Sequence, residues 1–119
     1  MKKVLIVDDE TEIVQLMMWV LSGCGAELLT AYDGEEALRI IQLHRPEIVL
    51  TDVMMPRLDG RELCHRIKTD AATKDIVVIL MSAFLPRNSV DSCADCTFTK
   101  PFDIVEVSQT IEAYLAKAA

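Results

Sequence analysis

The chain has 119 residues, 51% of them hydrophobic and 26% charged, which suits one domain, 1–119, with an ordinary apolar core. Its formal net charge is −7, and this excess of acid disfavours direct nucleic acid binding. No apolar stretch approaches the roughly 20 residues of a membrane helix, and no signal peptide is recognisable, so we expect a cytoplasmic protein without membrane contact.

The first half of the chain alternates short β-branched runs with amphipathic segments. The pattern predicts strands at Lys3–Val7 and Glu27–Ala31, and helices at about Thr11–Gly23 and Glu35–His44. Pro46 ends the second helix. Continuous apolar strands of this kind are typical of a parallel sheet that is buried on both faces.

The second half repeats the alternation, with one interruption. We expect a strand ending at Asp52, a helix over Gly60–Thr69, strands at Ile76–Met81 and Thr97–Thr99, and a last helix from about Asp103 to Lys117. A further helix is due between the last two strands. The residues of Ala83–Asp95 are poor helix formers with few apolar anchors, so at most one or two turns are predicted there. The alternation indicates an α/β fold with helices on both faces of the sheet.

Polar residues follow the predicted strands at their carboxyl ends. Asp8 and Asp9 follow the first strand, Asp52 ends the third, Ser82 follows the fourth and Lys100 follows the last. Ligands of open parallel sheets bind at this edge, so the five side chains should converge. Clustered carboxylates suit a divalent cation, and a lysine beside them suits a phosphoryl group. The carboxylates should also repel one another, which predicts at least one raised pKa when no cation is bound.

These residues stand in motifs that resemble the receiver domain of two-component response regulators, including its chemotaxis members. The matching motifs are Val7-Asp8-Asp9-Glu10, Asp52 to Gly60, Ser82-Ala83 and Lys100-Pro101-Phe102. The resemblance covers essentially the whole chain. It implies a flavodoxin-like, doubly wound five-stranded parallel sheet in the order 2-1-3-4-5, here with the fourth helix short or absent.

The resemblance also implies the roles of the site residues. Asp52 would be the phosphoacceptor. Mg²⁺, for which Mn²⁺ could substitute, would be bound directly by Asp9, Asp52 and the backbone carbonyl of Met54, and through water by Asp8. Ser82 and Lys100 would contact phosphoryl oxygens, and a cis bond before Pro101 would direct the lysine inward. The apolar Met54 and Phe84 would flank the phosphoryl group, and we expect slow loss of phosphate because neither can position a water by hydrogen bonding.

The function implied is a phosphorylation-dependent switch in a two-component phosphorelay, and not an enzyme. A histidine kinase or histidine phosphotransfer protein would donate the phosphoryl group, and a downstream protein or attached output domain would receive the signal.

Two departures from the family pattern keep an alternative open. Thr97 occupies a position that usually carries an aromatic, and the interval from Ser82 to Lys100 is shorter by roughly one helical turn. A receiver-fold binding module that phosphorylation does not regulate is therefore the second hypothesis. A phosphatase of the haloacid dehalogenase kind ranks last, because Met54 stands where those enzymes need an acid. The chain contains no GxxxxGK[ST] loop for nucleotide hydrolysis.

The four cysteines do not form a recognisable motif of their own. Cys24 and Cys64 fall in apolar helical patterns and are expected to be small core residues. Cys93 and Cys96 have CxxC spacing, but no two further ligands lie at comparable spacing. A metal or redox site there is disfavoured, and we expect both residues to be non-essential.

Overall fold

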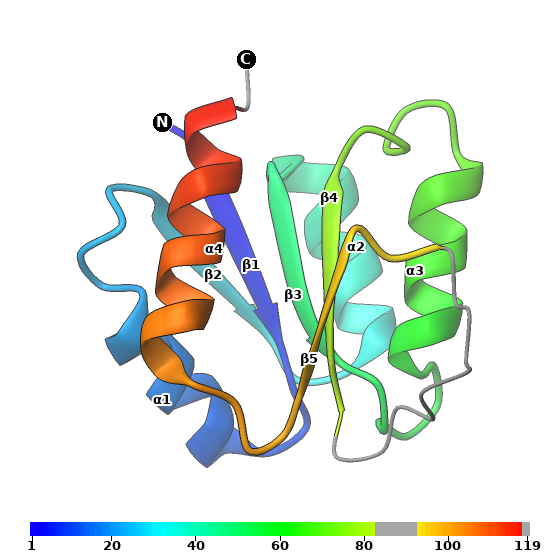
Figure 1. Cartoon of the computed structure of the whole chain (residues 1–119). Helices are drawn as coiled ribbons and strands as arrows, with labels where there is room; N and C mark the ends of the chain where they lie inside the picture. Colours follow the sequence, from blue (N-terminus) through cyan, green and yellow to red (C-terminus); the bar gives the residue numbers. More distant parts are fainter. Residues whose placement is uncertain (83–92, 118–119) are drawn as a thin grey trace.

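The computed structural model describes residues 1–82 and 93–117 and places a five-stranded, fully parallel sheet at its centre (Figure 1). The strands are β1 (Lys3–Val7), β2 (Glu27–Ala31), β3 (Ile48–Asp52), β4 (Val77–Ser82) and β5 (Cys96–Thr99). They are arranged in the order β2-β1-β3-β4-β5. This confirms the flavodoxin-like order and the parallel sheet expected from the sequence.

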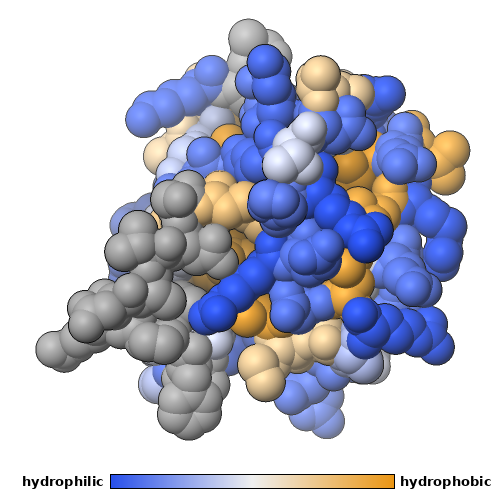
Figure 2. Space-filling view, turned by 90° about the vertical axis from the view of Figure 1, so that its right-hand side faces the viewer, coloured by the Kyte–Doolittle hydropathy of each residue, from blue (hydrophilic) through white to orange (hydrophobic). Residues whose placement is uncertain are grey.

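Helices cover both faces of the sheet (Figure 1). The described residues form α1 (Thr11–Val20), α2 (Gly34–His44), α3 (Gly60–Thr69) and α4 (Ile104–Lys117). Helices α1 and α4 pack on one face, and α2 and α3 pack on the other, so each face has its own apolar core. The outer surface on the α3 side is largely hydrophilic (Figure 2). Within the described residues, no helix combines the length and hydrophobicity of a membrane span.

Side-chain caps determine where three of the helices begin. The carboxylate of Asp33 accepts from the N–H of Glu36 at 2.8 Å, and that of Asp59 accepts from Glu62 at 2.9 Å. Asp103 accepts from the N–H of Val105 at 2.8 Å. Each bond satisfies a backbone donor that the helix itself leaves unpaired. The three aspartates therefore mark these helix starts in the sequence.

Helix α1 ends three residues earlier than the sequence indicated, at Val20 instead of Gly23. The N–H of Ser22 turns back to the carbonyl of Trp19, which tightens the last turn and ends the α-helical pattern. Cys24 lies in the turn beyond the helix, so its helical position was wrong, but it is half-buried and packs against the core as expected. Trp19, whose environment the sequence left open, is 69% exposed.

Strand β5 is held at the edge of the sheet by its own lead-in residues. The N–H of Asp95 donates to the carbonyl of Val78 at 2.9 Å, and its carboxylate accepts from the N–H of Val78 at 2.8 Å. Thr97 is exposed and Phe98 is buried, as expected for neighbours on a strand. The prediction of a short fourth helix falls mainly on residues 83–92, which lie outside the described residues.

Candidate functional site

Three carboxylates meet at the carboxyl edge of the sheet. Asp8 follows β1 and Asp52 ends β3, and the pairing of Val7 with Thr51 places these two aspartates side by side. One carboxylate oxygen from each of Asp8, Asp9 and Asp52 lies within 4.8 Å of the others. Asp8 is fully buried, Asp52 is 6% exposed, and Asp9 is exposed to solvent. The cluster therefore opens to solvent on the Asp9 side.

Lys100 adds a positive charge to this cluster. Its Nζ lies 3.1 Å from Oδ1 of Asp52 and 3.6 Å from Oδ2 of Asp8. The residue follows β5, and its backbone N–H donates to the carbonyl of Ser82 at 2.8 Å. The peptide bond between Lys100 and Pro101 is cis, as the resemblance implied. The last strand thus brings its lysine to both buried carboxylates.

The burial of Asp8 makes it an unusual acid. Its pKa is raised from 3.8 to about 6, chiefly by burial, against the lowering effect of the Glu10 N–H that donates to its Oδ1 at 2.9 Å. The charge of Asp52 raises the pKa further. The expected direction is confirmed, but its cause is revised: removal from water outweighs repulsion between the carboxylates.

The pKa of Lys100 is also raised, but here burial opposes the change and neighbouring charges cause it. Burial by itself lowers the pKa of Lys100, but the hydrogen bond to Asp52 and the charges of Asp52 and Asp8 outweigh that effect and raise the pKa. Lys100 therefore stays protonated at neutral pH. A permanent cation at this place suits an anionic group bound beside Asp52.

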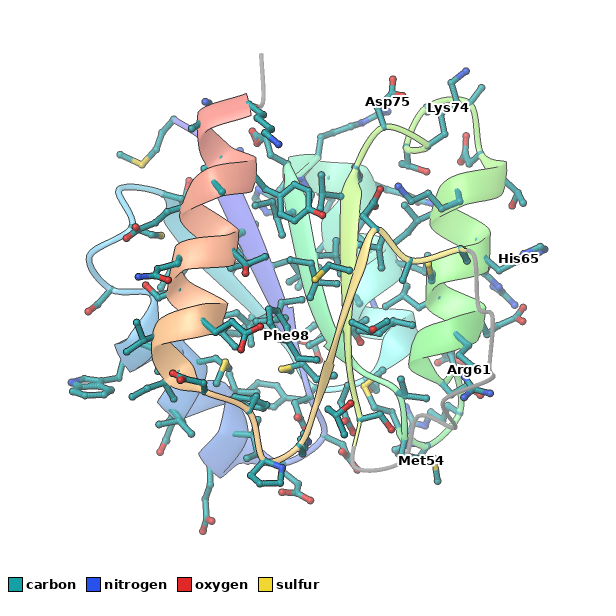
Figure 3. All side chains as sticks on the ribbon, in the orientation of Figure 1. Met54, Arg61, His65, Lys74, Asp75 and Phe98 are labelled. Atoms are coloured by element: carbon teal, nitrogen blue, oxygen red, sulfur yellow. The ribbon has the colours of Figure 1, made fainter. Side chains whose placement is uncertain are left out.

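Two further predicted residues lie around the cluster. Ser82 ends β4, the strand next to β3, and its side chain is almost fully buried. Met54 lies in the loop after β3 with a 74% exposed side chain, at the edge of the molecule where the strands end (Figure 3). The structure thus gathers Asp8, Asp9, Asp52 and Lys100 directly and places Ser82 and Met54 on adjoining segments.

Gly60 is a supporting residue that the sequence alone did not single out. A Cβ atom at Gly60 would lie 2.2 Å from the carbonyl oxygen of Asp52 and 2.9 Å from Cα of Val53. The N–H of Gly60 also donates to the carbonyl of Val53 at 2.9 Å. Helix α3 therefore begins directly against the backbone that carries Asp52. The sequence predicted a helix that begins at Gly60, but not this close approach.

Gly34 makes a comparable contact at the start of α2. Its Cβ position would be 2.5 Å from the carbonyl oxygen of Leu58, so the helix presses on the loop between β3 and α3. Arg57 in this loop has a φ of 68° and lies 3.7 Å from the carboxylate of Asp33. The loop that carries Met54 is thus held against α2.

The donor set of the cluster fits a hard divalent cation. Its three candidate side-chain ligands are all carboxylates. Hard cations such as Mg²⁺ and Ca²⁺ prefer oxygen ligands of this kind to softer ligands. Oδ2 of Asp8 is buried and accepts no hydrogen bond from any described residue. A buried acceptor without a donor is costly, and a cation bound in the cluster would satisfy it, directly or through a coordinated water. Asp8, Asp9 and Asp52 are the residues that could hold such an ion.

The two cysteines of the CxxC pair are divided between the two faces of the sheet. Cys93 packs with the core between the sheet and α2 and α3, whereas Cys96 packs with the core on the opposite face of the sheet. Among the described residues, no cysteine belongs to a group that could hold a metal ion. The Sγ of Cys93 instead lies 2.8 Å from the Sγ of Cys64 on α3, a contact that sequence spacing did not indicate.

Comparison with known proteins identifies relatives along the whole chain. Residues 4–112 match the response regulator receiver domain family. The chain is 35% identical over 119 residues to the alkaline phosphatase synthesis transcriptional regulatory protein PhoP of Bacillus subtilis, covering 98% of this chain and 50% of PhoP. It is also 35% identical to protein PilG of Pseudomonas aeruginosa over 95% of this chain and 87% of PilG. The chain spans about half the length of the first curated relatives it matches.

Solved structures give the same result for the fold. The receiver domain of a signal transduction histidine kinase from Syntrophus aciditrophicus superposes with a TM-score of 0.90 at 31% identity, covering 99% of this chain and 92% of that one. The chemotaxis protein CheY4 of Vibrio cholerae superposes with a TM-score of 0.85 at 29% identity, covering 96% and 98%.

Proposed function

Since the chain belongs to the response regulator receiver domain family, we propose that Asp52 accepts a phosphoryl group and that the domain is thereby a switch in a two-component phosphorelay. Receiver domains of this family serve phosphorylation-dependent signalling. The observation that carries the assignment is the position of Lys100, with Nζ 3.1 Å from Asp52 and 3.6 Å from Asp8. The ammonium group of Lys100 thus lies beside both of the carboxylates that are buried among the described residues.

The proposed transfer uses the carboxylate of Asp52 as the nucleophile. One of its oxygens forms a bond to phosphorus while the bond from phosphorus to the donor's imidazole nitrogen breaks, leaving an aspartyl phosphate. Lys100 compensates the negative charge gathered at the phosphoryl oxygens, and Ser82 is our proposed hydroxyl donor to one of them.

Mg²⁺ is the cation we propose for the acidic cluster, with Mn²⁺ as a substitute. Asp9, Asp52 and the backbone carbonyl of Met54 would be direct ligands, and Asp8 would act through water. When bound, the cation neutralises charge on the transferring phosphoryl group. Without it, Lys100 is the cationic side chain that the described residues place beside Asp8 and Asp52.

The proposed donor is a phosphohistidine on a histidine kinase or a histidine phosphotransfer protein. The domain would turn over no external substrate, so we class it as a signalling module and not as an enzyme. Because PhoP and other relatives are about twice as long as this chain, an attached output domain or a separate protein could receive the signal. The cytoplasm remains our prediction.

Labelling with acetyl phosphate tests the assignment of Asp52. We expect wild-type protein with Mg²⁺ to gain one phosphoryl group by intact mass, and Asp52→Asn to gain none, because an amide cannot form the acyl phosphate. Asp75→Asn is the matched control, since Asp75 is exposed and lies at the opposite edge of the molecule from Met54 (Figure 3).

Two outcomes would contradict the proposal. Equal labelling of Asp52→Asn and wild type would place the phosphoryl group elsewhere. A folded wild-type protein that stays unlabelled, both with acetyl phosphate and with a phosphorylated histidine donor, would favour the binding module instead.

A further inference from the structure

Outside the acidic site, two cysteines on different elements lie in close contact among the described residues. Sγ of Cys64 in α3 lies 2.8 Å from Sγ of Cys93, which precedes β5. A disulfide bond is about 2.05 Å long, so the two sulfurs need to move less than about 1 Å to bond. Both side chains are thiols in this structure.

The two thiols differ in their access to solvent. Cys64 is fully buried in the core beneath α2 and α3, and Cys93 is half-buried against the same core. Cys93 is therefore the more accessible of the two thiols to a small oxidant, and the sulfur of Cys64 lies 2.8 Å behind it. A reactive cysteine next to a second, resolving cysteine is the arrangement on which reversible thiol oxidation depends.

The remaining cysteines are poorly placed for the same chemistry. Cys96 packs against the core on the other face of the sheet, and burial raises the pKa of its thiol, which lowers its thiolate fraction. Cys24 packs against that same opposite core. The sheet thus separates both of them from Cys64.

From this geometry we propose that Cys64 and Cys93 form a redox modification site, which a peroxide converts into a disulfide between α3 and the start of β5. The proposal concerns neither Asp52 nor its phosphorylation. The pairing follows from packing across 29 positions of sequence, and it is not the CxxC pairing that the sequence suggests.

The oxidation balances in two steps. The sulfur of Cys93 attacks one peroxide oxygen, so that an S–O bond forms, the O–O bond breaks, and a sulfenic acid and water (from hydrogen peroxide) result. The sulfur of Cys64 then attacks the sulfur of Cys93, the S–S bond forms, and the hydroxyl group leaves as water with the proton of Cys64. A dithiol reductant reverses the reaction by thiol–disulfide exchange.

The disulfide would reinforce a connection that ion pairing already makes. Nζ of Lys68 on α3 lies 2.7 Å from Oδ2 of Asp95, two residues beyond Cys93. The same ammonium group donates to the carbonyl of Ile76 at 2.7 Å. Oxidation would therefore join covalently two segments that already lie together, and large backbone rearrangement is not needed.

Thiol counting after mild oxidation tests the site. The reduced protein is treated with hydrogen peroxide, remaining thiols are alkylated, and intact mass and peptide mapping follow. We expect two of the four cysteines to escape alkylation, a linked peptide pair that contains Cys64 and Cys93, and full recovery of four alkylated thiols after a dithiol reductant.

Matched variants make the test specific. Cys96→Ser should form the disulfide at the wild-type rate, whereas Cys93→Ser, which lacks one of the two sulfurs, should keep Cys64 open to alkylation. Cys93 is half-buried, so its serine variant should fold, which circular dichroism checks. A linkage of Cys93 to Cys96, loss of the linkage in Cys96→Ser, or four alkylated thiols in peroxide-treated wild type would overturn the proposal.

Discussion

At the scale of single residues, Asp8 stands out as an ionisable side chain that is removed from water. It is fully buried, one of its oxygens accepts no hydrogen bond from the described residues, and its pKa is raised to about 6. An acid with this placement is stable when protonated or when a cation compensates its charge. The same carboxylate should therefore govern how stability and cation binding depend on pH.

In the absence of divalent cations, we expect the protein to lose stability as the pH rises through about 6. The folded pKa of Asp8 lies above its unfolded value of 3.8, so the protonated form favours folding fully below pH 3.8, and this contribution disappears above about 6. Two pKa units correspond to roughly 3 kcal/mol of unfolding free energy. Urea unfolding in EDTA from about pH 4 to about pH 7 measures it.

Asp8→Asn isolates the effect of this carboxyl group, because an amide stays neutral over the whole interval. Between about pH 4 and about pH 7, Asp8→Asn should lose less unfolding free energy than wild type, by roughly 3 kcal/mol. Asp75→Asn should behave like wild type because Asp75 is exposed. Equal losses in wild type and Asp8→Asn would show that Asp8 does not carry the pH dependence.

Met54 is the residue expected to affect how fast the phosphoryl group is lost. Its side chain is 74% exposed beside the acidic cluster and cannot orient a water molecule by hydrogen bonding. Met54→Asn should therefore shorten the lifetime of the phosphorylated form, by up to about tenfold. The decay of phosphorylated protein after removal of acetyl phosphate measures this lifetime.

The matched control for Met54→Asn is Met18→Asn, since Met18 is an exposed methionine on α1, and its variant should decay like wild type. Slower decay of Met54→Asn, or equal acceleration in both variants, would remove Met54 from this role. The companion expectation for Phe84 falls outside the described residues and stays a prediction.

At the scale of elements, the start of α3 is coupled to the end of β3 through Gly60. A methyl group at this position would meet the Asp52 carbonyl oxygen at 2.2 Å, and backbone on both sides of the contact cannot yield cheaply. We expect Gly60→Ala to lower the unfolding free energy by about 2–3 kcal/mol and to slow phosphoryl acceptance, because Asp52 itself would shift.

Gly23→Ala is the control for Gly60→Ala, because no atom lies within 4 Å of its Cβ position. Its unfolding free energy should change by less than about 1 kcal/mol, in the stabilising direction, since alanine restricts the unfolded chain. Urea unfolding and acetyl phosphate labelling of both variants decide the matter. A Gly60→Ala protein with wild-type stability and labelling would show that α3 can move away without consequence.

The elements also show which local signals are reliable. The capped starts of α2, α3 and α4 follow directly from Asp33, Asp59 and Asp103, whose carboxylates bond to nearby N–H groups. The end of α1 has no such single signal, and the sequence overestimated the helix by three residues. Each of these three helix starts is specified by one side chain, whereas the end of α1 depends on a turn formed by several residues.

At the scale of the whole molecule, cation binding should raise the free energy of unfolding. A cation held by the acidic cluster binds the folded chain alone, because the unfolded chain does not bring β1 and β3 together. At 100 times its dissociation constant it would add about 2.7 kcal/mol to the unfolding free energy. We expect MgCl₂ to raise the urea midpoint of wild type, and EDTA to reverse the change.

Asp9→Asn provides the comparison, because Asp9 is the exposed member of the cluster and its replacement should disturb packing least. The variant should gain much less stability from MgCl₂ than wild type. NaCl at the same ionic strength controls for screening. An equal gain in NaCl, or in Asp9→Asn, would place the cation effect outside this cluster.

The sequence alone predicted the parallel sheet and the meeting of four side chains at its edge, whereas the strand order came from the resemblance to receiver domains. Strand runs such as Lys3–Val7 and the alternation with helices predicted the parallel sheet, and Asp8, Asp9, Asp52 and Lys100 were identified as neighbours in advance. This was possible because parallel strands bring their carboxyl ends to one edge. A residue that ends a strand therefore has a place in space that local sequence already specifies.

Only the tertiary structure decided the contacts that depend on how faces pack. It showed that burial is the main cause of the raised pKa of Asp8, that Gly60 presses on Asp52, and that Cys93 meets Cys64 while Cys96 lies across the sheet. Propensity and periodicity act between near neighbours in sequence, whereas desolvation and contact arise between residues that folding brings together from distant positions.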